Sequence, residues 1–236
     1  MHIPNGLLDP KASAGMAFAA AAVLGYCIAK VRQALVAAVP ESILAGAGNI
    51  AVNITQSSKK MVSSIAENHL MKMAAIGSLV FSAQMFNFPV ASGTSGHLLG
   101  GILAAVALGP FSGTIVIAIV LAVQSMFFGD GGIMALGANM LNMAVVGTFI
   151  SYYIYYVLKQ RFGFNIGIAV ASLFSVLLAS AACAIEIGLF GTVDLYNVIS
   201  AMTLIHARIG IAEALLTILA LNFLSSIDLG LEGKLE

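Results

Sequence analysis

The chain has 236 residues, of which 60% are hydrophobic and 8% are charged, with ten basic and ten acidic side chains. A soluble domain carries about 25% charged residues, so this composition excludes an ordinary soluble enzyme. The zero formal net charge excludes a basic nucleic-acid binder, and we expect no nucleic-acid partner. We predict an all-α polytopic membrane protein with a single transmembrane domain over residues 1–236.

Apolar segments follow one another along most of the chain, and breaks such as Gly129-Asp130-Gly131-Gly132 separate them. Most of these segments reach the length of about 20 residues that a spanning helix needs, although the third is short and rich in glycine. We therefore predict seven transmembrane helices. In chain order, they cover residues 12–30, 70–88, 96–109, 111–128, 133–158, 165–190 and 197–226.

Basic residues set the predicted orientation, because Lys and Arg accumulate in cytoplasmic loops. With the N-terminus outside and the C-terminus cytoplasmic, only Lys11 falls on the outer side. The cytoplasmic set is then Lys30, Arg32, Lys59, Lys60, Lys72, Lys159, Arg161 and Lys234. Residues 31–69 contain Pro40, Glu41 and Asn49, so we predict a cytoplasmic or interfacial insert between the first two spans. If this insert also spanned, the chain would have eight helices.

Residues 1–11 are predicted to be an extracellular metal-binding N-terminus. They lack the basic region of a secretory signal, so we expect Met1 and His2 to remain in the mature protein. The Met1 amine and the His2 amide can close a five-membered ring around a metal ion, and the His2 amide and Nδ1 a six-membered ring. His97, also on the outer side, could complete a square of nitrogens, which suits Ni(II) or Cu(II). The alternative is that His2 is a solvated terminal residue.

Three sequence runs resemble the CbiM/NikM family, the substrate-binding membrane subunits of energy-coupling-factor (ECF) transporters for cobalt and nickel. They are Met1-His2-Ile3-Pro4-Asn5-Gly6, Gly93-Thr94-Ser95-Gly96-His97 and Asp130-Gly131-Gly132-Ile133-Met134-Ala135-Leu136-Gly137-Ala138-Asn139. The resemblance covers residues 1–30 and about 70–215. Position 5 is Asn where the family more often has Asp, which predicts a weaker turn cap but removes no metal ligand.

The resemblance implies high-affinity capture of a divalent metal ion by Met1, His2 and His97. Its Gly-Thr-Ser-Gly-His form favours Ni²⁺ over Co²⁺. It implies a transporter subunit rather than an enzyme, in the plasma membrane of a prokaryote. The implied partners are an ECF coupling transmembrane (T) subunit, two ABC ATPase subunits and a small accessory membrane subunit. ATP hydrolysis falls to the partners, because residues 93–97 lack the Gly-Lys-Ser/Thr ending of a phosphate-binding loop.

Two other functions stay open at this point. One is a self-sufficient secondary transporter or channel for a cation, although the sequence shows no clear internal repeat. The other is an intramembrane metalloenzyme that uses His206 and Glu213, although the chain has no His-Glu-x-x-His run.

The remaining polar residues of the apolar segments are predicted to have structural roles. We expect Arg208 to pair with Glu186 or Glu213, and we leave open a direct contact of His206 with the metal. His69 is expected to be a solvated helix end. Cys27 and Cys183 are expected to be small buried residues. One polar residue near His97 in sequence should hydrogen-bond its free ring nitrogen, with the candidates Gln84, Asn87, Thr94 and Ser95.

Overall fold

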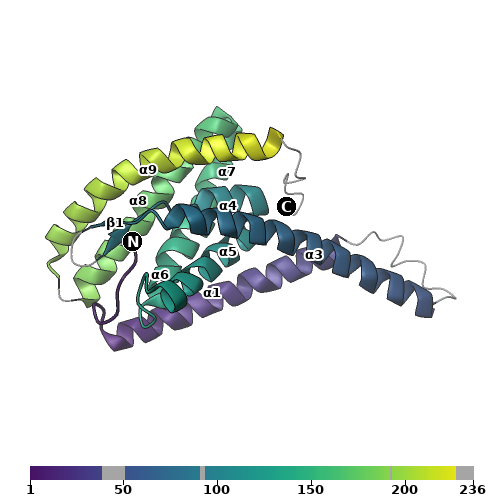
Figure 1. Ribbon diagram of the computed structural model, residues 1–236, viewed down its shortest axis with the longest axis horizontal. Helices are drawn as coiled ribbons and strands as arrows, with labels where there is room; N and C mark the ends of the chain where they lie inside the picture. The colour runs from purple at the N-terminus through teal and green to yellow at the C-terminus, as the bar shows by residue number, and fades with distance from the viewer. Residues whose placement is uncertain (39–50, 91–93, 192, 227–236) are drawn as a thin grey trace.

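A computed structural model describes residues 1–38, 51–90, 94–191 and 193–226, and it is almost entirely helical (Figure 1). The predicted all-α architecture is confirmed, apart from one short antiparallel pair of two-residue strands. The helices are α1 (Pro10–Ala37), α3 (Ala51–Gln84), α4 (Gly101–Leu108), α5 (Pro110–Val123), α6 (Leu136–Met140), α7 (Ser151–Phe162), α8 (Phe164–Phe190) and α9 (Leu195–Ser226). The π-helical turns are η1 (Gln124–Phe128) and η2 (Leu141–Ile150), and the strands are β1 (Phe88–Pro89) and β2 (Ser95–Gly96).

Five helical stretches among the described residues are long and apolar enough to cross a membrane. They are Pro10–Ala37, Pro110–Phe128, Leu136–Phe162, Phe164–Phe190 and Leu195–Ser226. These match the first, fourth, fifth, sixth and seventh predicted spans, so the chain is a multi-pass membrane protein. The second predicted span lies in α3, a 34-residue helix whose first half carries most of its polar side chains.

The third predicted span, 96–109, is only partly helical. Residues 94–100 are non-helical and end in a left-handed turn at Gly100 (φ +72°), and α4 that follows has eight residues, about 12 Å, whereas the hydrocarbon core is about 30 Å thick. Non-helical backbone at membrane depth is tolerated only where protein encloses it. That condition is met here, because seven of the eight residues of α4 are buried and His97 is completely buried.

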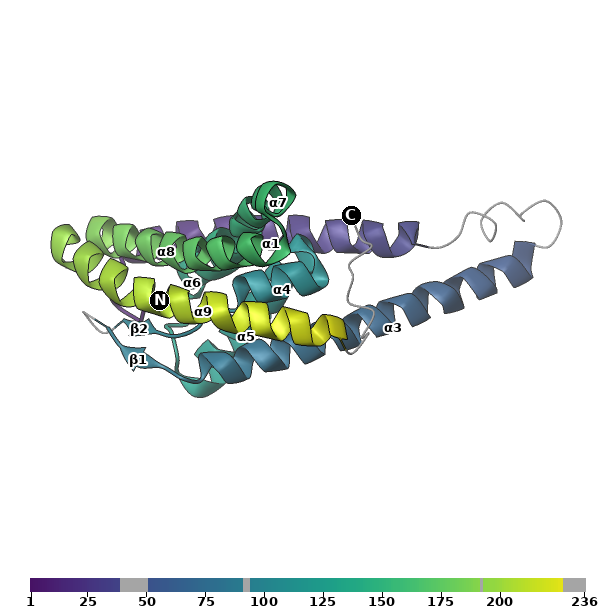
Figure 2. The same ribbon diagram turned by 90° about the horizontal axis from the view of Figure 1, so that it is seen from above.

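The short helix α4 lies at the centre of the bundle. It packs against α3, α5, α7, α8, α9 and η2, while α8 and α9 run side by side along one flank (Figures 1 and 2). The turn from α4 into α5 is tight, since a Cβ at Gly113 would meet the main chain of Ala105 at 2.7 Å. Helices α1 and α3 extend together beyond this bundle on one side (Figure 2).

The predicted insert of residues 31–69 is partly helical. Helix α1 continues to Ala37, and α3 already begins at Ala51. Pro40, Glu41 and Asn49 lie outside the described residues. The cytoplasmic position of the insert 31–69 stays a prediction.

Helix α1 begins at Pro10 because the preceding residues form a firm N-terminal cap. The Asp9 carboxylate accepts hydrogen bonds from the N–H groups of Lys11 and Ala12, and proline suits the first helical position. The Asp9 N–H donates to the Phe190 carbonyl at the end of α8 (2.9 Å). This anchor directs residues 1–8 back into the bundle rather than away from it (Figure 1).

Candidate metal centre

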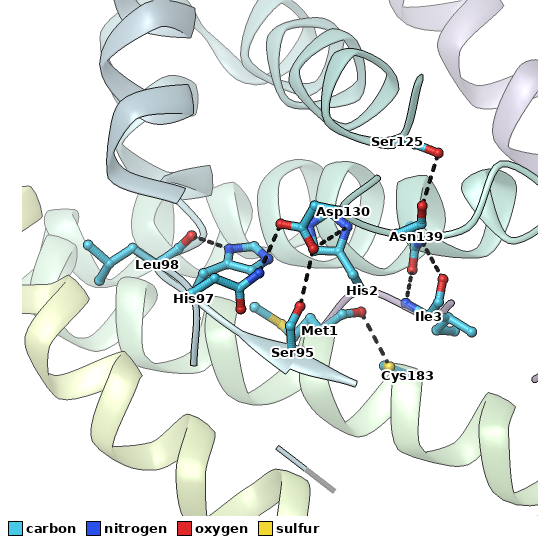
Figure 3. Close-up of polar contacts among 12 residues, drawn as sticks. Met1, His2, Ile3, Ser95, His97, Leu98, Ser125, Asp130, Asn139 and Cys183 are labelled. Atoms are coloured by element: carbon cyan, nitrogen blue, oxygen red, sulfur yellow. Dashed lines mark hydrogen bonds and ion pairs between the residues drawn. The ribbon is translucent and has the colours of Figure 1, made fainter. Parts of the chain in front are cut away.

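The first three residues are buried inside the bundle, with exposed fractions of 0% for Met1, 3% for His2 and 0% for Ile3 (Figure 3). The side-chain amide of Asn139 in α6 makes two hydrogen bonds to the main chain of Ile3, as a main-chain peptide group on a neighbouring strand would. The Ile3 N–H donates to Asn139 Oδ1 (2.8 Å), and Asn139 Nδ2 donates to the Ile3 carbonyl (3.2 Å). The Gly132 N–H donates to the same carbonyl (2.8 Å). These three bonds fix the register of the chain start.

The buried Met1 amine has a lowered pKa. Burial lowers the pKa of this amine from 8.0 to about 6, and the nearby Asp130 carboxylate opposes the shift. The Met1 carbonyl accepts from the Cys183 thiol on α8 (3.5 Å). At neutral pH the amine is therefore mostly uncharged, which is the form that can bind a metal ion.

The His2 and His97 rings face each other, with centroids 4.7 Å apart and planes inclined by 54° (Figure 3). His97 Nδ1 lies 2.6 Å from the Leu98 carbonyl, so Nδ1 carries the proton and Nε2 keeps its lone pair. By distance and angle, no residue with a described position hydrogen-bonds either His2 ring nitrogen or His97 Nε2. Burial lowers the pKa of His2 well below 6.5, with the neighbouring His97 adding to the shift, so the His2 ring is neutral.

The unpartnered nitrogens at the chain start are a specific feature of this site. No hydrogen bond of the His2 main-chain N–H occurs within the part of the chain that the structure describes. A buried polar group without a partner costs about 1–3 kcal/mol, and such groups are rare. Met1, His2 and His97, the three residues predicted from sequence, are thus brought together with free nitrogens.

Asp130 was not predicted as part of the site, yet its carboxylate lies 3.9 Å from His2 Nδ1. Asn87 Nδ2 donates to one oxygen (3.0 Å), and the Ser95 hydroxyl lies 3.5 Å from the other. Burial raises the pKa of Asp130, while the Met1 amine and these two donors lower it. The Asp130 carboxylate places negative charge beside the His2 ring, at a distance longer than a hydrogen bond.

Gly131 and Asn139 also support the site, although the sequence analysis assigned no role to either residue. Gly131 has φ +86°, and a Cβ there would lie 2.5 Å from His2 Nδ1. Only glycine fits this turn, both for its backbone conformation and for the space that His2 occupies. The one signal in the sequence was that both residues fall in a run resembling the CbiM/NikM family.

Two buried side chains clamp the turn that follows His97. Gln84 at the end of α3 donates to the Leu99 carbonyl (2.6 Å). Glu213 of α9 accepts from the N–H groups of Leu99 (2.5 Å) and Gly100 (2.9 Å). The expectation that a neighbouring side chain would bond the His97 ring was wrong. The ring bonds to its own segment, and the neighbours hold that segment or Asp130 instead.

The predicted ion pair of Arg208 was also wrong. Glu213 is occupied by the two main-chain N–H groups, and Glu186 accepts from Asn142 Nδ2 (2.7 Å). Arg208 is exposed, because it lies about 140° around α9 from the buried position of Glu213. Within the described ranges, Arg208 forms no ion pair.

Other expectations had mixed outcomes. Cys27 and Cys183 are both free and buried, as predicted. His69 is not a solvated helix end, because it is half-buried and its Nε2 lies 2.8 Å from the Ser112 hydroxyl. Asn5 keeps its capping role, since its Oδ1 accepts from the Met134 N–H (2.9 Å).

No group of three or more His, Cys, Asp or Glu side chains suited to a metal ion occurs among the residues with described positions. Beside the imidazoles of His2 and His97, the buried chain start offers the main-chain nitrogens of Met1 and His2.

Comparison with known proteins identifies the family. Residues 37–230 match the family CbiM, described as the cobalt uptake substrate-specific transmembrane region. The chain belongs to the CbiM family. A CbiM cobalt transport protein of Clostridium cellulovorans is 32% identical over 191 residues, covering 75% of this chain and 72% of the relative. A Rhodobacter capsulatus protein named as a fused nickel transport protein, NikMN, is 35% identical over 155 residues, covering 66% of this chain and 36% of the relative.

A solved structure supports the same family. The crystal structure of a truncated transition metal transporter has a TM-score of 0.76 and 30% identity, covering 96% of this chain and 99% of that one. The matched part of this chain spans 66%, 49% and 64% of the length of the first three curated relatives. The CbiM family match begins at residue 37, so it does not include the first three residues.

Proposed function

We propose that this CbiM-family chain captures a divalent transition metal ion, Ni²⁺ in preference to Co²⁺, as the substrate-binding subunit of an ECF importer. The Met1 amine, the His2 amide nitrogen and Nδ1, and His97 Nε2 are the four ligands. The observation that carries the proposal is the burial of Met1, His2 and His97 side by side, with no hydrogen-bond partner among the described residues for either His2 ring nitrogen or for His97 Nε2.

The chemistry of this ligand set favours nickel. Two adjoining chelate rings from one dipeptide force their three nitrogens towards a plane, and square-planar nitrogen sites suit Ni(II) and Cu(II). A deprotonated amide and imidazoles disfavour Mg²⁺ and Ca²⁺, which take oxygen ligands. Among the nitrogen-preferring ions, Ni²⁺ binds more tightly than Co²⁺.

The proposed assembly has the N-terminus outside, seven spans and a cytoplasmic C-terminus. The metal ion reaches the site from outside and is released inwards. The energy comes from two ABC ATPase subunits that act through an ECF T subunit, with a small accessory membrane subunit as a further partner. This arrangement is supported by the family membership and by the lack of a phosphate-binding loop in residues 93–97.

Calorimetry with Ni²⁺ tests the proposal on three purified forms of the full chain. They are the chain with its own Met1 terminus, the same chain with one glycine added before Met1, and a control with one glycine added after the last residue. The added residue before Met1 converts the ligating amine into an amide. The native and control chains should bind about one ion each with equal affinity, and the N-terminally extended chain should lose tight binding.

Equally tight binding by the N-terminally extended chain would refute the amine ligand. If none of the three forms binds nickel, the alternative of a self-sufficient cation transporter takes precedence. That alternative predicts proton-driven metal uptake into liposomes that contain this chain alone.

A further inference from the structure

A third buried imidazole lies beside the proposed chelate. His206 of α9 is completely buried, and its Nε2 has no hydrogen-bond partner in the part of the chain that the structure describes. Its Nδ1 lies 2.7 Å from the Met202 carbonyl one helical turn earlier. A carbonyl only accepts, so Nδ1 carries the proton and Nε2 presents its lone pair. A side chain used only for packing would gain from an apolar replacement, because a buried acceptor without a donor is costly.

The lone pair of His206 is directed at the segment that carries His97. A Cβ built on Gly96 would lie 3.6 Å from His206 Nε2 and 2.9 Å from Ile209 Cδ1. The 3.6 Å distance is an ordinary van der Waals contact, so His206 Nε2 lies directly beside the main chain that precedes His97; the closer Ile209 Cδ1 is what leaves no room for a side chain at Gly96.

Successive residues on one face of α9 contact successive positions of the segment 94–100. Met202 Sδ accepts from the Thr94 hydroxyl (3.5 Å), His206 lies at Gly96, and Glu213 holds the turn after His97. Residues at i, i+4, i+7 and i+11 share a face of an α-helix, so these contacts come from one stripe. A metal ligand on this stripe keeps a fixed position relative to His97.

We propose that His206 is a second metal-accepting nitrogen, which takes the ion over as it leaves the chelate of Met1, His2 and His97. This inference rests on the proposed function of that chelate. In the exchange, the Nε2 lone pair forms a new bond to the ion while the bond to a chelate nitrogen breaks. The His2 amide regains its proton from water, and Nδ1–H stays bonded to the Met202 carbonyl. No oxidation or reduction takes place.

The transfer role has a kinetic consequence. A planar four-nitrogen complex that releases its ion without a new ligand must first lose a bond. A lone pair held beside it allows bond formation and bond breaking together. His206 therefore accelerates both capture and release. It leaves the equilibrium affinity of the chelate nearly unchanged, because it is not one of the four ligands of the resting complex.

Two apolar variants of His206 distinguish a metal-binding role of this side chain from a packing role. His206→Phe keeps a ring and removes both nitrogens, whereas His206→Met is equally apolar but supplies a thioether sulfur that can bind a soft metal ion. His69→Gln, about 22 Å along α3 from Gln84, is the matched control for loss of an imidazole elsewhere. All variants are made in the full chain with its own Met1 terminus.

The measurement is the rate of nickel transfer from the loaded chain to excess chelator, with calorimetric affinity measured in parallel. His206→Phe should slow transfer about tenfold or more, with the affinity within about threefold of the native chain. His206→Met should restore much of the rate, and His69→Gln should match the native chain. Equal rates for the Phe and Met variants, whether both native or both slow, would overturn the proposal. Failure of the native chain to bind nickel would instead refute the proposed function.

Discussion

Asn139→Ala should loosen the N-terminal segment and weaken nickel binding without removing a metal ligand. Asn139 makes two hydrogen bonds to the main chain of Ile3, at 2.8 and 3.2 Å. The substitution leaves the buried Ile3 N–H without a partner, while the Ile3 carbonyl keeps its bond from Gly132.

The magnitude follows from that loss. A buried N–H left unpaired costs about 1–3 kcal/mol, and the second, longer bond contributes about 0.5–1 kcal/mol. The sum of roughly 1.5–4 kcal/mol reduces the free energy with which the N-terminal segment is held in the bundle, because release of the segment exposes the Ile3 amide to water. Since 1.4 kcal/mol corresponds to a factor of ten, nickel affinity should fall about 10- to 700-fold.

Calorimetry on chains with the native terminus provides the assay. Asn142→Ala is the matched control, because Asn142 is a buried amide three residues along that bonds Glu186 and not the N-terminal segment. The control should lose thermal stability but keep its affinity within about threefold. Native affinity in Asn139→Ala, or an equal loss in both variants, would refute the claim that Asn139 acts by holding the chain start.

The remaining predictions concern pH, the turn at Gly131 and the clamp at Glu213. Nickel affinity should fall as the pH is lowered. Between pH 8 and pH 6 it should fall about tenfold for each unit of decrease, because binding displaces the His2 amide proton. Below the Met1 amine pKa of about 6 it should fall about a hundredfold for each further unit, since a second proton is then displaced; a constant slope in calorimetry from pH 8 to 5 would contradict this. Gly131→Ala should weaken nickel binding at least tenfold, because a Cβ there meets His2 Nδ1 at 2.5 Å; calorimetric affinity equal to that of the native chain would show that the turn relaxes freely. Glu213→Ala should lower the free energy of unfolding by about 2–4 kcal/mol, because the N–H groups of Leu99 and Gly100 lose their carboxyl acceptor, and an unchanged melting temperature in detergent would contradict the clamp.

The sequence was sufficient for the membrane class and the long spans, and it singled out three candidate ligands that the structure buries close together. Composition and apolar length locate the long helices, because lipid leaves few alternatives for the backbone. Met1 and His2 could be chosen because their ligating atoms are defined by covalent structure at the chain start. His97 followed from its predicted side of the membrane and from the resemblance of its motif.

The short central helix and the supporting contacts could not be derived in the same way. Residues 96–109 are apolar enough to suggest a span, but sequence periodicity does not reveal that residues 94–100 stay non-helical among the surrounding helices. The roles of Asn139 and Glu213 depend on long-range pairs, 136 and 114 positions apart from their partners Ile3 and Leu99. Such pairs are set by packing and leave no local pattern.

X-ray absorption at the nickel edge tests the central claim most directly, using the nickel-loaded chain with its own Met1 terminus. The spectrum reports the number, type and geometry of the atoms bound to the ion. The account predicts four nitrogen ligands in a square plane, with no sulfur from Cys183 or a methionine. An octahedral shell rich in oxygen, or any nickel–sulfur bond, would contradict binding by the Met1 amine, the His2 amide and imidazole, and His97.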